Sequence, residues 1–328
     1  MGILPQGNSG KGHGHGVGCG MLFPPSPEDP MDLSELSPVG LVGCGLMGAG
    51  IAQVAAQAGL DVVVKEADAP ALKRGLARID AQWEKAVAKG RLDAAMRAAC
   101  ADRLKGTLHW TDLSDCGLVI EAVPEILDLK LRAFTELDKV LAPSTLLCSN
   151  TSSLPITELM AVLGPDRHPF VAGLHFFNPV PAMPLVEIIR TVATGDEALG
   201  LLRAFVAKLG KTAILAPDAP GFVVNRLLVP YILDCIRCRE QKLASTDDID
   251  AGMRLGCGHP MGPLHLADFI GLDTIVNVAE VMFEAYGDPR YKAPPLVKQL
   301  VAAGRTGRKS GLGFYRWEGE TRMEALAL

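Results

Sequence analysis

The 328-residue sequence has no apolar run that approaches the ~20 residues needed to span a bilayer, so it predicts no membrane segment. It also lacks a strong charge of either sign. The formal net charge of −5 gives no reason to expect nucleic acid or an acidic membrane surface as a partner. The eight cysteines are spread along the chain and form no disulfide framework, which suits a reducing cytosol and predicts a cytoplasmic protein. What remains is a globular, enzyme-like composition with 48% hydrophobic and 21% charged residues.

Metal-ligand clusters are missing as well. Cys235-x-x-Cys238 has neither a second cysteine pair nor nearby histidines, so packing explains it better than a metal, and no metal site is predicted. The first thirty residues are rich in glycine and proline and match neither a signal peptide nor a transit peptide. We expect residues 1–35 to be a disordered tail without a role in function, and Met31 is a candidate for the true start.

One stretch predicts dinucleotide binding. An apolar run that begins at Val39 ends in Gly43-x-Gly45-x-x-Gly48 and passes directly into an alanine-rich helical pattern. Gly43 would make the tight turn, Gly45 would let the backbone approach a pyrophosphate, and Gly48 would let the helix pack on the strand. The pyrophosphate would sit on unpaired N–H groups at the helix N-terminus. A second strand pattern closes on Glu66, about 20 residues after the glycines, where a carboxylate binds the ribose.

Apolar strands alternating with helices predict an α/β fold, a Rossmann-type and mainly parallel sheet with helices on both faces. Residues 70–103 are a longer helical stretch than a crossover needs, and Gly90 should divide it into a hairpin that projects from the sheet. After a linker at 216–221, helices are expected over 222–242, 246–255, 263–284 and 293–304. We therefore expect an NAD-binding domain at 36–217 and an all-α domain at 218–328, whose surplus apolar faces predict a homodimer.

Two candidate catalytic residues lie on apolar strand patterns. One strand delivers His175 at its end, and residues 185–189 place Glu187 between apolar neighbours. A lone histidine in an apolar segment is more often a core residue than a catalyst, but a buried carboxylate is costly unless it is paired. His175 is the obvious partner, and such a pair serves general-base catalysis. The spacing alone leaves a structural pair and a catalytic pair equally open.

With these residues assembled, the chain resembles the 3-hydroxyacyl-CoA dehydrogenase family, and within it the single-function 3-hydroxybutyryl-CoA dehydrogenases. The matching segments run in family order from residue 38 to residue 317. They are Gly43-Cys-Gly-Leu-Met-Gly, Ser149-Asn-Thr-Ser-Ser-Leu, Gly173-Leu-His-Phe-Phe-Asn-Pro, Pro220-Gly-Phe-Val-Val-Asn-Arg, His259-Pro-Met-Gly-Pro-Leu and Lys309-Ser-Gly-Leu-Gly-Phe-Tyr.

The resemblance implies a reaction and roles for four residues. The enzyme would interconvert a short-chain (S)-3-hydroxyacyl-CoA, such as 3-hydroxybutyryl-CoA, and the 3-oxoacyl-CoA, with NAD as hydride acceptor. His175 would take the proton of the 3-hydroxyl, and Glu187 would hold the imidazole and stabilise its charged form. Ser152 and Asn225 would hydrogen-bond the substrate oxygen and fix its orientation.

The resemblance also implies the contacts of the two nucleotides. NAD would contact Gly43, Gly45, Leu46, Met47, Gly48, Glu66, Glu121, Asn178 and Lys309. The Glu66 carboxylate suits two ribose hydroxyls and would repel a 2′-phosphate, so NAD is favoured over NADP. A lysine that the family often carries after Ala-Val-x-Glu is absent, with Asp128 at the corresponding position. Lys85 and Lys89, on the expected hairpin, are candidates for contact with CoA.

Two other functions are weighed against this one. Dehydrogenases of free sugar acids, of the gulonate or lambda-crystallin type, replace the Phe-Phe-Asn that here follows His175, so a thioester is preferred. A catalytically silent dinucleotide-binding protein would keep the fold and lose the polar site, whereas all four candidate residues are present. The sequence leaves open the acyl chain length, the direction of the reaction and the pathway: fatty-acid breakdown, butyrate formation or aromatic-acid degradation.

Overall fold

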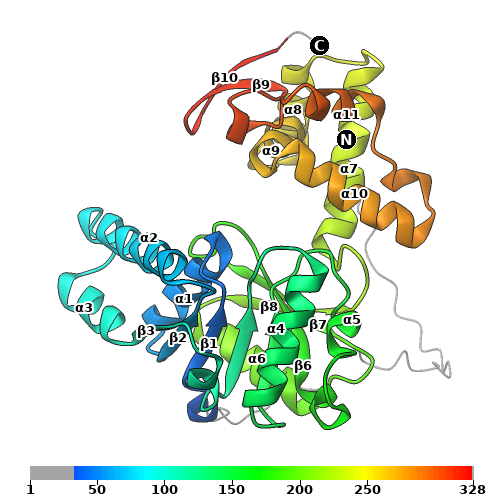
Figure 1. Cartoon of the computed structure of the whole chain (residues 1–328). Coiled ribbons are helices and arrows are strands. Elements are labelled where there is room, and N and C mark those ends of the chain that lie inside the picture. The colour runs from blue at the N-terminus through cyan, green and yellow to red at the C-terminus, as the bar shows by residue number, and fades with distance from the viewer. Residues whose placement is uncertain (1–32, 327–328) are drawn as a thin grey trace, which may run out of the picture.

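The computed structural model describes residues 33–326, which form a sheet domain and a helical domain joined by one long helix (Figure 1). The expected tail at residues 1–35 lies outside the described residues as far as residue 32. The first described residues form one turn of 3-10 helix, η1 (Leu33–Leu36), and Leu36 is buried in the core of the sheet domain. Residues 33–35, which lie within the range expected for the tail, are thus part of a described helix. No helix of the described part is long and apolar enough to cross a membrane.

Eight strands form one sheet in the order β3-β2-β1-β4-β5-β6-β7-β8. Their bounds are β1 Val39–Val42, β2 Val62–Lys65, β3 Leu104–Thr107, β4 Leu118–Glu121, β5 Leu146–Ser149, β6 Val171–Phe176, β7 Leu185–Arg190 and β8 Thr212–Pro217. The pairings are parallel except that between β6 and β7, which is antiparallel. The central strands are buried on both faces, which explains their continuous apolar runs. The predicted mainly parallel sheet is confirmed.

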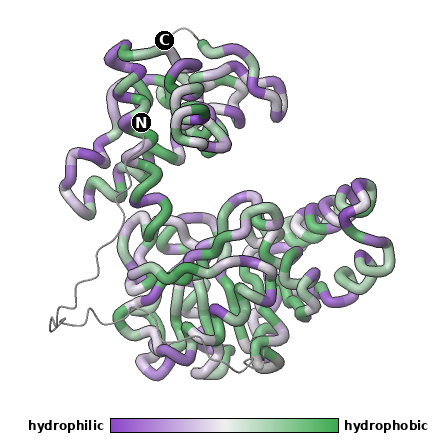
Figure 2. Tube along the Cα trace, turned by 180° about the vertical axis from the view of Figure 1, so that it is seen from behind, coloured by the Kyte–Doolittle hydropathy of each residue, from purple (hydrophilic) through white to green (hydrophobic). Residues whose placement is uncertain are grey.

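Six helices accompany the sheet. They are α1 Leu46–Gln57, α2 Ala69–Ala88, α3 Ala94–Asp102, α4 Leu127–Val140, α5 Ile156–Met160 and α6 Asp196–Lys208. As predicted, α2 and α3 form a hairpin that turns at Gly90, and it projects from the sheet in cyan in Figure 1. Ile79 and Trp83, one turn apart on α2, are buried in the core, so the hairpin is packed against the domain along part of its length. Its remaining surface carries many hydrophilic residues (Figure 2).

The second domain consists of helices and a terminal β-hairpin. Its elements are α7 Val224–Glu240, α8 Thr246–Cys257, α9 Pro263–Ile270, α10 Leu272–Tyr286, α11 Pro295–Ala302, β9 Tyr315–Glu318 and β10 Thr321–Ala325. The prediction of one helix over 263–284 is wrong, because Gly271, with φ of +109°, separates α9 from α10. The helical character of the domain is confirmed, but β9 and β10 were not expected. Asp268 ties this hairpin to α9 by accepting two backbone N–H bonds and the indole N–H of Trp317.

Candidate active site

A cavity of about 1880 Å³ lies between the two domains, at the carboxyl ends of the parallel strands. The sheet domain contributes the loops that follow β1, β2, β4, β5 and β6, and α7, α9 and α10 contribute a mostly apolar wall. A single small ligand fills about 300–1,000 Å³, so a dinucleotide and a second ligand can share this space. Nine predicted site residues line it: Gly43, Gly45, Leu46, Met47, Glu66, Ser152, His175, Asn178 and Asn225.

The three glycines have the geometry that a dinucleotide requires. Gly43 has a φ of +94°, a left-handed conformation that suits the tight turn. A Cβ on Gly48 would lie 1.8 Å from the carbonyl oxygen of Gly43, so α1 packs directly on that turn. A Cβ on Gly45 would meet no heavy atom within 4 Å, which leaves this backbone open to a ligand. No side chain caps the N-terminus of α1, so its N–H groups are placed for an anion such as pyrophosphate.

Glu66 follows β2 and lies beside the glycine turn. Its Oε1 accepts a hydrogen bond from the Cys44 N–H at 2.5 Å, and its Oε2 accepts one from the Ala67 N–H at 3.0 Å. The preceding Lys65 holds its ammonium 3.7 Å from the centroid of the Trp110 ring, and burial lowers the pKa of this lysine. A carboxylate fixed at this edge of the cavity can accept two ribose hydroxyls and would repel a phosphate. The residues present therefore fit NAD.

His175 and Glu187 form a buried pair. They face each other in the antiparallel register of β6 and β7, with His175 Nδ1 2.7 Å from Glu187 Oε2. Glu187 Oε1 accepts hydrogen bonds from the N–H groups of Val223 at 3.0 Å and Val224 at 2.9 Å, where α7 begins. The helix N-terminus favours the negative charge. A carboxylate can only accept, so in the neutral imidazole Nδ1 of His175 donates and Nε2 keeps a lone pair.

Two apolar rings lie beside this imidazole. The Phe177 ring lies 4.6 Å and the Phe222 ring 5.5 Å from the His175 ring, measured between centroids. Asn225 lies in the first turn of α7, one residue after the N–H groups that bind Glu187, and it also lines the cavity. The same carboxylate thus positions both the histidine and the start of the helix that carries Asn225.

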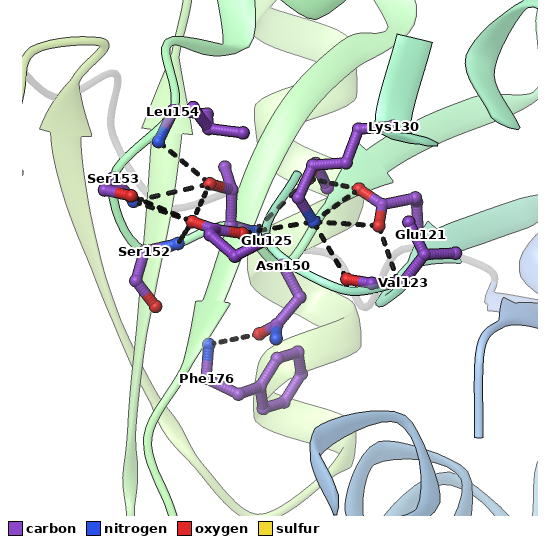
Figure 3. Close-up of polar contacts among 11 residues, drawn as sticks. Glu121, Val123, Glu125, Lys130, Asn150, Ser152, Ser153, Leu154 and Phe176 are labelled. Carbon is purple, nitrogen blue, oxygen red and sulfur yellow. Dashed lines mark hydrogen bonds and ion pairs between the residues drawn. The ribbon is translucent and has the colours of Figure 1, made fainter. Parts of the chain in front are cut away.

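A second polar network lies near Ser152, and the sequence analysis missed it (Figure 3). Lys130 on α4 is buried and pairs with Glu121 at 2.9 Å and with Glu125 at 3.2 Å. Glu125 lines the cavity and accepts hydrogen bonds from the Thr151 hydroxyl at 2.6 Å and the Ser152 N–H at 3.0 Å. The loop that carries Ser152 is therefore held by a carboxylate that is itself held by a buried ammonium.

The charge state of Glu125 follows from these contacts. Burial by itself raises the pKa of this carboxyl, but the Lys130 ammonium and the hydrogen bonds from residues 151–153 outweigh burial, so the pKa lies below its ordinary value. Glu125 is therefore ionised at neutral pH and acts only as an acceptor. Glu125 lies four residues after the end of β4, in the loop at the carboxyl end of this strand. A carboxylate in such a loop is the signal by which the sequence could have identified it.

Two predictions about this region are corrected. Glu121 does not line the cavity: its side chain is fully buried, and its carboxylate binds Lys130 and the Ser149 hydroxyl, the latter at 2.6 Å. Glu125 takes the place beside the cavity instead. A lysine was expected to be absent, with Asp128 in its place, but Lys130, two residues further on, supplies a buried ammonium to this network.

Three predicted contacts lie away from the cavity lining. Lys309 belongs to the helical domain, where its ammonium lies 2.6 Å from the carboxylate of Asp273. Lys85 and Lys89 are exposed near the turn of the α2–α3 hairpin and do not line the cavity. Within residues 33–326, no group of three or more histidines, cysteines or carboxylates could hold a metal ion.

Comparison with known proteins gives two family matches that together cover most of the chain. Residues 38–219 match the 3-hydroxyacyl-CoA dehydrogenase NAD binding domain, and residues 221–317 match the C-terminal domain of the same family. A probable 3-hydroxybutyryl-CoA dehydrogenase of Deinococcus radiodurans is 44% identical over 282 residues, 85% of this chain and 99% of the relative. A 3-hydroxybutyryl-CoA dehydrogenase of Mycobacterium tuberculosis is 45% identical over 281 residues, 85% of this chain and 98% of the relative.

Solved structures agree with these matches. The crystal structure of FadB2 of M. tuberculosis superimposes with a TM-score of 0.83 at 45% identity, covering 85% of this chain and 98% of that one. The (S)-3-hydroxybutyryl-CoA dehydrogenase PaaH1 of Ralstonia eutropha gives a TM-score of 0.82 at 42% identity, with the same coverage. This chain thus shares with these two proteins the fold of both its sheet domain and its helical domain.

Proposed function

The chain belongs to the 3-hydroxyacyl-CoA dehydrogenase family and is an NAD-dependent enzyme of that type, and from this premise we propose that it interconverts (S)-3-hydroxybutyryl-CoA and acetoacetyl-CoA. The names of the similar relatives support the short acyl chain, and the name of PaaH1 supports the S configuration. The observation that carries the chemistry is the buried His175–Glu187 pair at the wall of the cavity.

In the oxidation, His175 Nε2 takes the proton of the 3-hydroxyl as the C–H bond at C3 breaks. Bound NAD⁺ supplies the hydride acceptor, and the C3–O bond becomes a carbonyl. The imidazolium that forms keeps its Nδ1–H bond to Glu187, whose charge stabilises it and which itself takes no proton. In the reverse direction the same imidazolium returns the proton to the oxygen of the 3-oxo group.

Substrate orientation would rest on two polar residues that line the same cavity as the histidine. Ser152 and Asn225 would hydrogen-bond the oxygen at C3 and direct its proton toward His175. Glu125 holds the backbone of Ser152 and Glu187 holds the start of the helix that carries Asn225, so both groups are fixed before substrate binds. The Phe177 and Phe222 rings limit the access of water to the imidazole.

Oxidation of NADH by the purified protein, with acetoacetyl-CoA and free acetoacetate supplied in parallel, tests the proposal. We expect rapid turnover of the thioester alone, with (S)-3-hydroxybutyryl-CoA as the product resolved by chiral chromatography. Intact NADH binding without thioester turnover would contradict the proposed substrate, and turnover of the free acid would favour a sugar-acid type of dehydrogenase. A series of longer 3-oxoacyl-CoA substrates then fixes the preferred chain length.

We also propose that the enzyme is a cytoplasmic homodimer that associates through its helical domain. Leu243, between α7 and α8, and Leu255, in the last turn of α8, are 75% and 82% exposed, and such side chains are commonly covered by a second copy. Among the described residues all seven cysteines are unpaired, which suits a reducing compartment. Sedimentation equilibrium measures the assembly, and a monomer at micromolar concentration would contradict it.

A further inference from the structure

Tyr286, the last residue of α10, is bonded to the turn that leads from the sheet domain into α7. Its hydroxyl donates a hydrogen bond to the carbonyl oxygen of Pro220 at 2.9 Å. The guanidinium of Arg226, on the first turn of α7, lies over the Tyr286 ring, 4.5 Å from its centroid. Burial raises the pKa of the Tyr286 hydroxyl, so it remains a donor over the working range of the enzyme.

The turn that receives this bond has an unfavourable backbone. Gly221 has a φ of +80° and Phe222 a φ of +45°, and the second value is costly for a residue with a side chain. Such a conformation persists only where its surroundings hold it. Phe222 is buried with its ring against His175, and the next residue, Val223, donates its N–H to Glu187. The conformation of this turn therefore sets the position of the Glu187 carboxylate.

Both domains hold the turn. On the side of the sheet domain, Asp218 accepts hydrogen bonds from the N–H groups of Ile156 at 2.9 Å and Thr157 at 2.7 Å. On the side of the helical domain, α10 provides the Tyr286 bond and packs so closely that a Cβ on Gly221 would lie 2.5 Å from the sulfur of Met282. The turn thus contacts α10 on one side and the His175–Glu187 pair on the other, so it couples the position of α10 to that pair.

We propose that Tyr286 is a positioning residue, which holds the strained Pro220–Phe222 turn so that the backbone at Val223 keeps Glu187 aligned with His175. The inference rests on the proposed function for its consequence in catalysis, because it assigns the His175–Glu187 pair to the reaction. The domain contact then has a role beyond folding: the helical domain, which closes one wall of the cavity, also sets the orientation of the base on the opposite wall.

The variant Tyr286→Phe removes only the hydroxyl and keeps the ring beneath Arg226. Tyr291 provides a matched control, because its ring lies 5.5 Å from that of Tyr286, it is buried, and its hydroxyl has no hydrogen-bond partner among the described residues. We expect Tyr286→Phe to lower kcat roughly 10-fold with a change in KM of less than about 3-fold, because one hydrogen bond is lost and the base is misplaced. Tyr291→Phe should leave both constants within about 2-fold of the wild type.

A spectroscopic measurement separates this proposal from the proposed function. The Nδ1–H of an imidazole bonded to a buried carboxylate gives a strongly downfield proton resonance, assigned here by its loss in His175→Gln. We expect Tyr286→Phe to move or broaden this resonance and Tyr291→Phe to preserve it. An unchanged resonance in Tyr286→Phe would overturn the positioning role whatever the activity. A wild-type enzyme without thioester turnover would overturn the proposed function, and a shifted resonance in Tyr286→Phe would still support the structural coupling.

Discussion

His175 and Glu187 stand directly opposite each other on β6 and β7, the strand pair at which the sheet changes direction. Because β7 runs antiparallel to β6, its carboxylate lies beside the carboxyl end of β6, where the cavity opens. The next strand, β8, runs parallel to β7, and residues 218–223 lead from its end to α7, which begins with its N–H groups on Glu187. The reversal of β7 thus brings the Glu187 carboxylate beside the His175 imidazole, and the N-terminus of α7 lies on the same carboxylate.

Replacing His175 by glutamine should abolish turnover and spare cofactor binding. Glutamine can hydrogen-bond the substrate but cannot take its proton, so we expect kcat to fall roughly 1000-fold. The glycine turn and Glu66 do not contact this side chain through any bond in the site described, so the dissociation constant of NADH, measured by fluorescence titration, should stay within about 2-fold of the wild type. Turnover near the wild-type rate would rule out His175 as the general base.

The glycines of the cofactor turn should respond differently to alanine. A Cβ on Gly48 would lie 1.8 Å from the carbonyl oxygen of Gly43, so Gly48→Ala should lower the unfolding free energy by about 3 kcal/mol or more. A Cβ on Gly45 would meet nothing, so Gly45→Ala should keep the unfolding free energy within about 1 kcal/mol while it weakens NADH binding at least about 10-fold. Urea unfolding and NADH titration measure both effects. Equal loss of stability in the two variants would contradict this assignment of roles.

Glu66 should set the preference between the two nicotinamide dinucleotides. The variant Glu66→Gln keeps an oxygen that can accept the Cys44 N–H, but it loses the acceptor of the Ala67 N–H together with the charge that would repel a 2′-phosphate. The ratio of kcat/KM for NADPH to that for NADH should therefore rise roughly 10-fold or more. Glu280→Gln, which removes an exposed carboxylate on α10, is the control. An unchanged ratio in Glu66→Gln would show that selection lies elsewhere in the cavity.

The sequence predicted the parts of the site whose signal is local. The three glycines predict a turn, an apolar run with one polar end predicts a strand that carries a candidate catalytic side chain, and a buried Glu187 requires a partner, for which His175 is the obvious choice. For that pair the expected contact is present at 2.7 Å. The sheet order, by contrast, depends on pairings between strands that are distant in sequence, and no local signal encodes them.

The errors arose where the direction of one side chain or one backbone angle decides the outcome. Glu121 ends a buried strand and points into the domain, whereas Glu125, four residues later, lines the cavity. The sequence shows two carboxylates at this point and does not show which one is covered. Similarly, the apolar pattern continues across residues 263–284, and only the left-handed backbone at Gly271 reveals that two helices share it.

Glu125 should make the stability of the enzyme depend on pH in the acid range. Its pKa in the folded protein lies below the ordinary value of 4.5, so its contribution to stability is present above pH 4.5 and is lost as the pH falls through the folded pKa. In Glu125→Gln that contribution is absent at every pH. The wild type should therefore exceed Glu125→Gln in unfolding free energy at neutral pH, and the difference should shrink as the pH falls below 4.5.

Urea unfolding of both proteins at a series of pH values measures this difference, and Glu280→Gln again provides the control, because its carboxylate is exposed and paired only at the surface with Lys298. A difference that stayed constant from neutral pH to well below pH 4.5 would mean that Glu125 stabilises the fold through packing and not through its charge. Glu121 and the Val123 carbonyl would then suffice for the Lys130 ammonium, and the loop that carries Ser152 would owe its position to other contacts. The pH dependence therefore decides whether the charge of Glu125 orders the loop that carries Ser152.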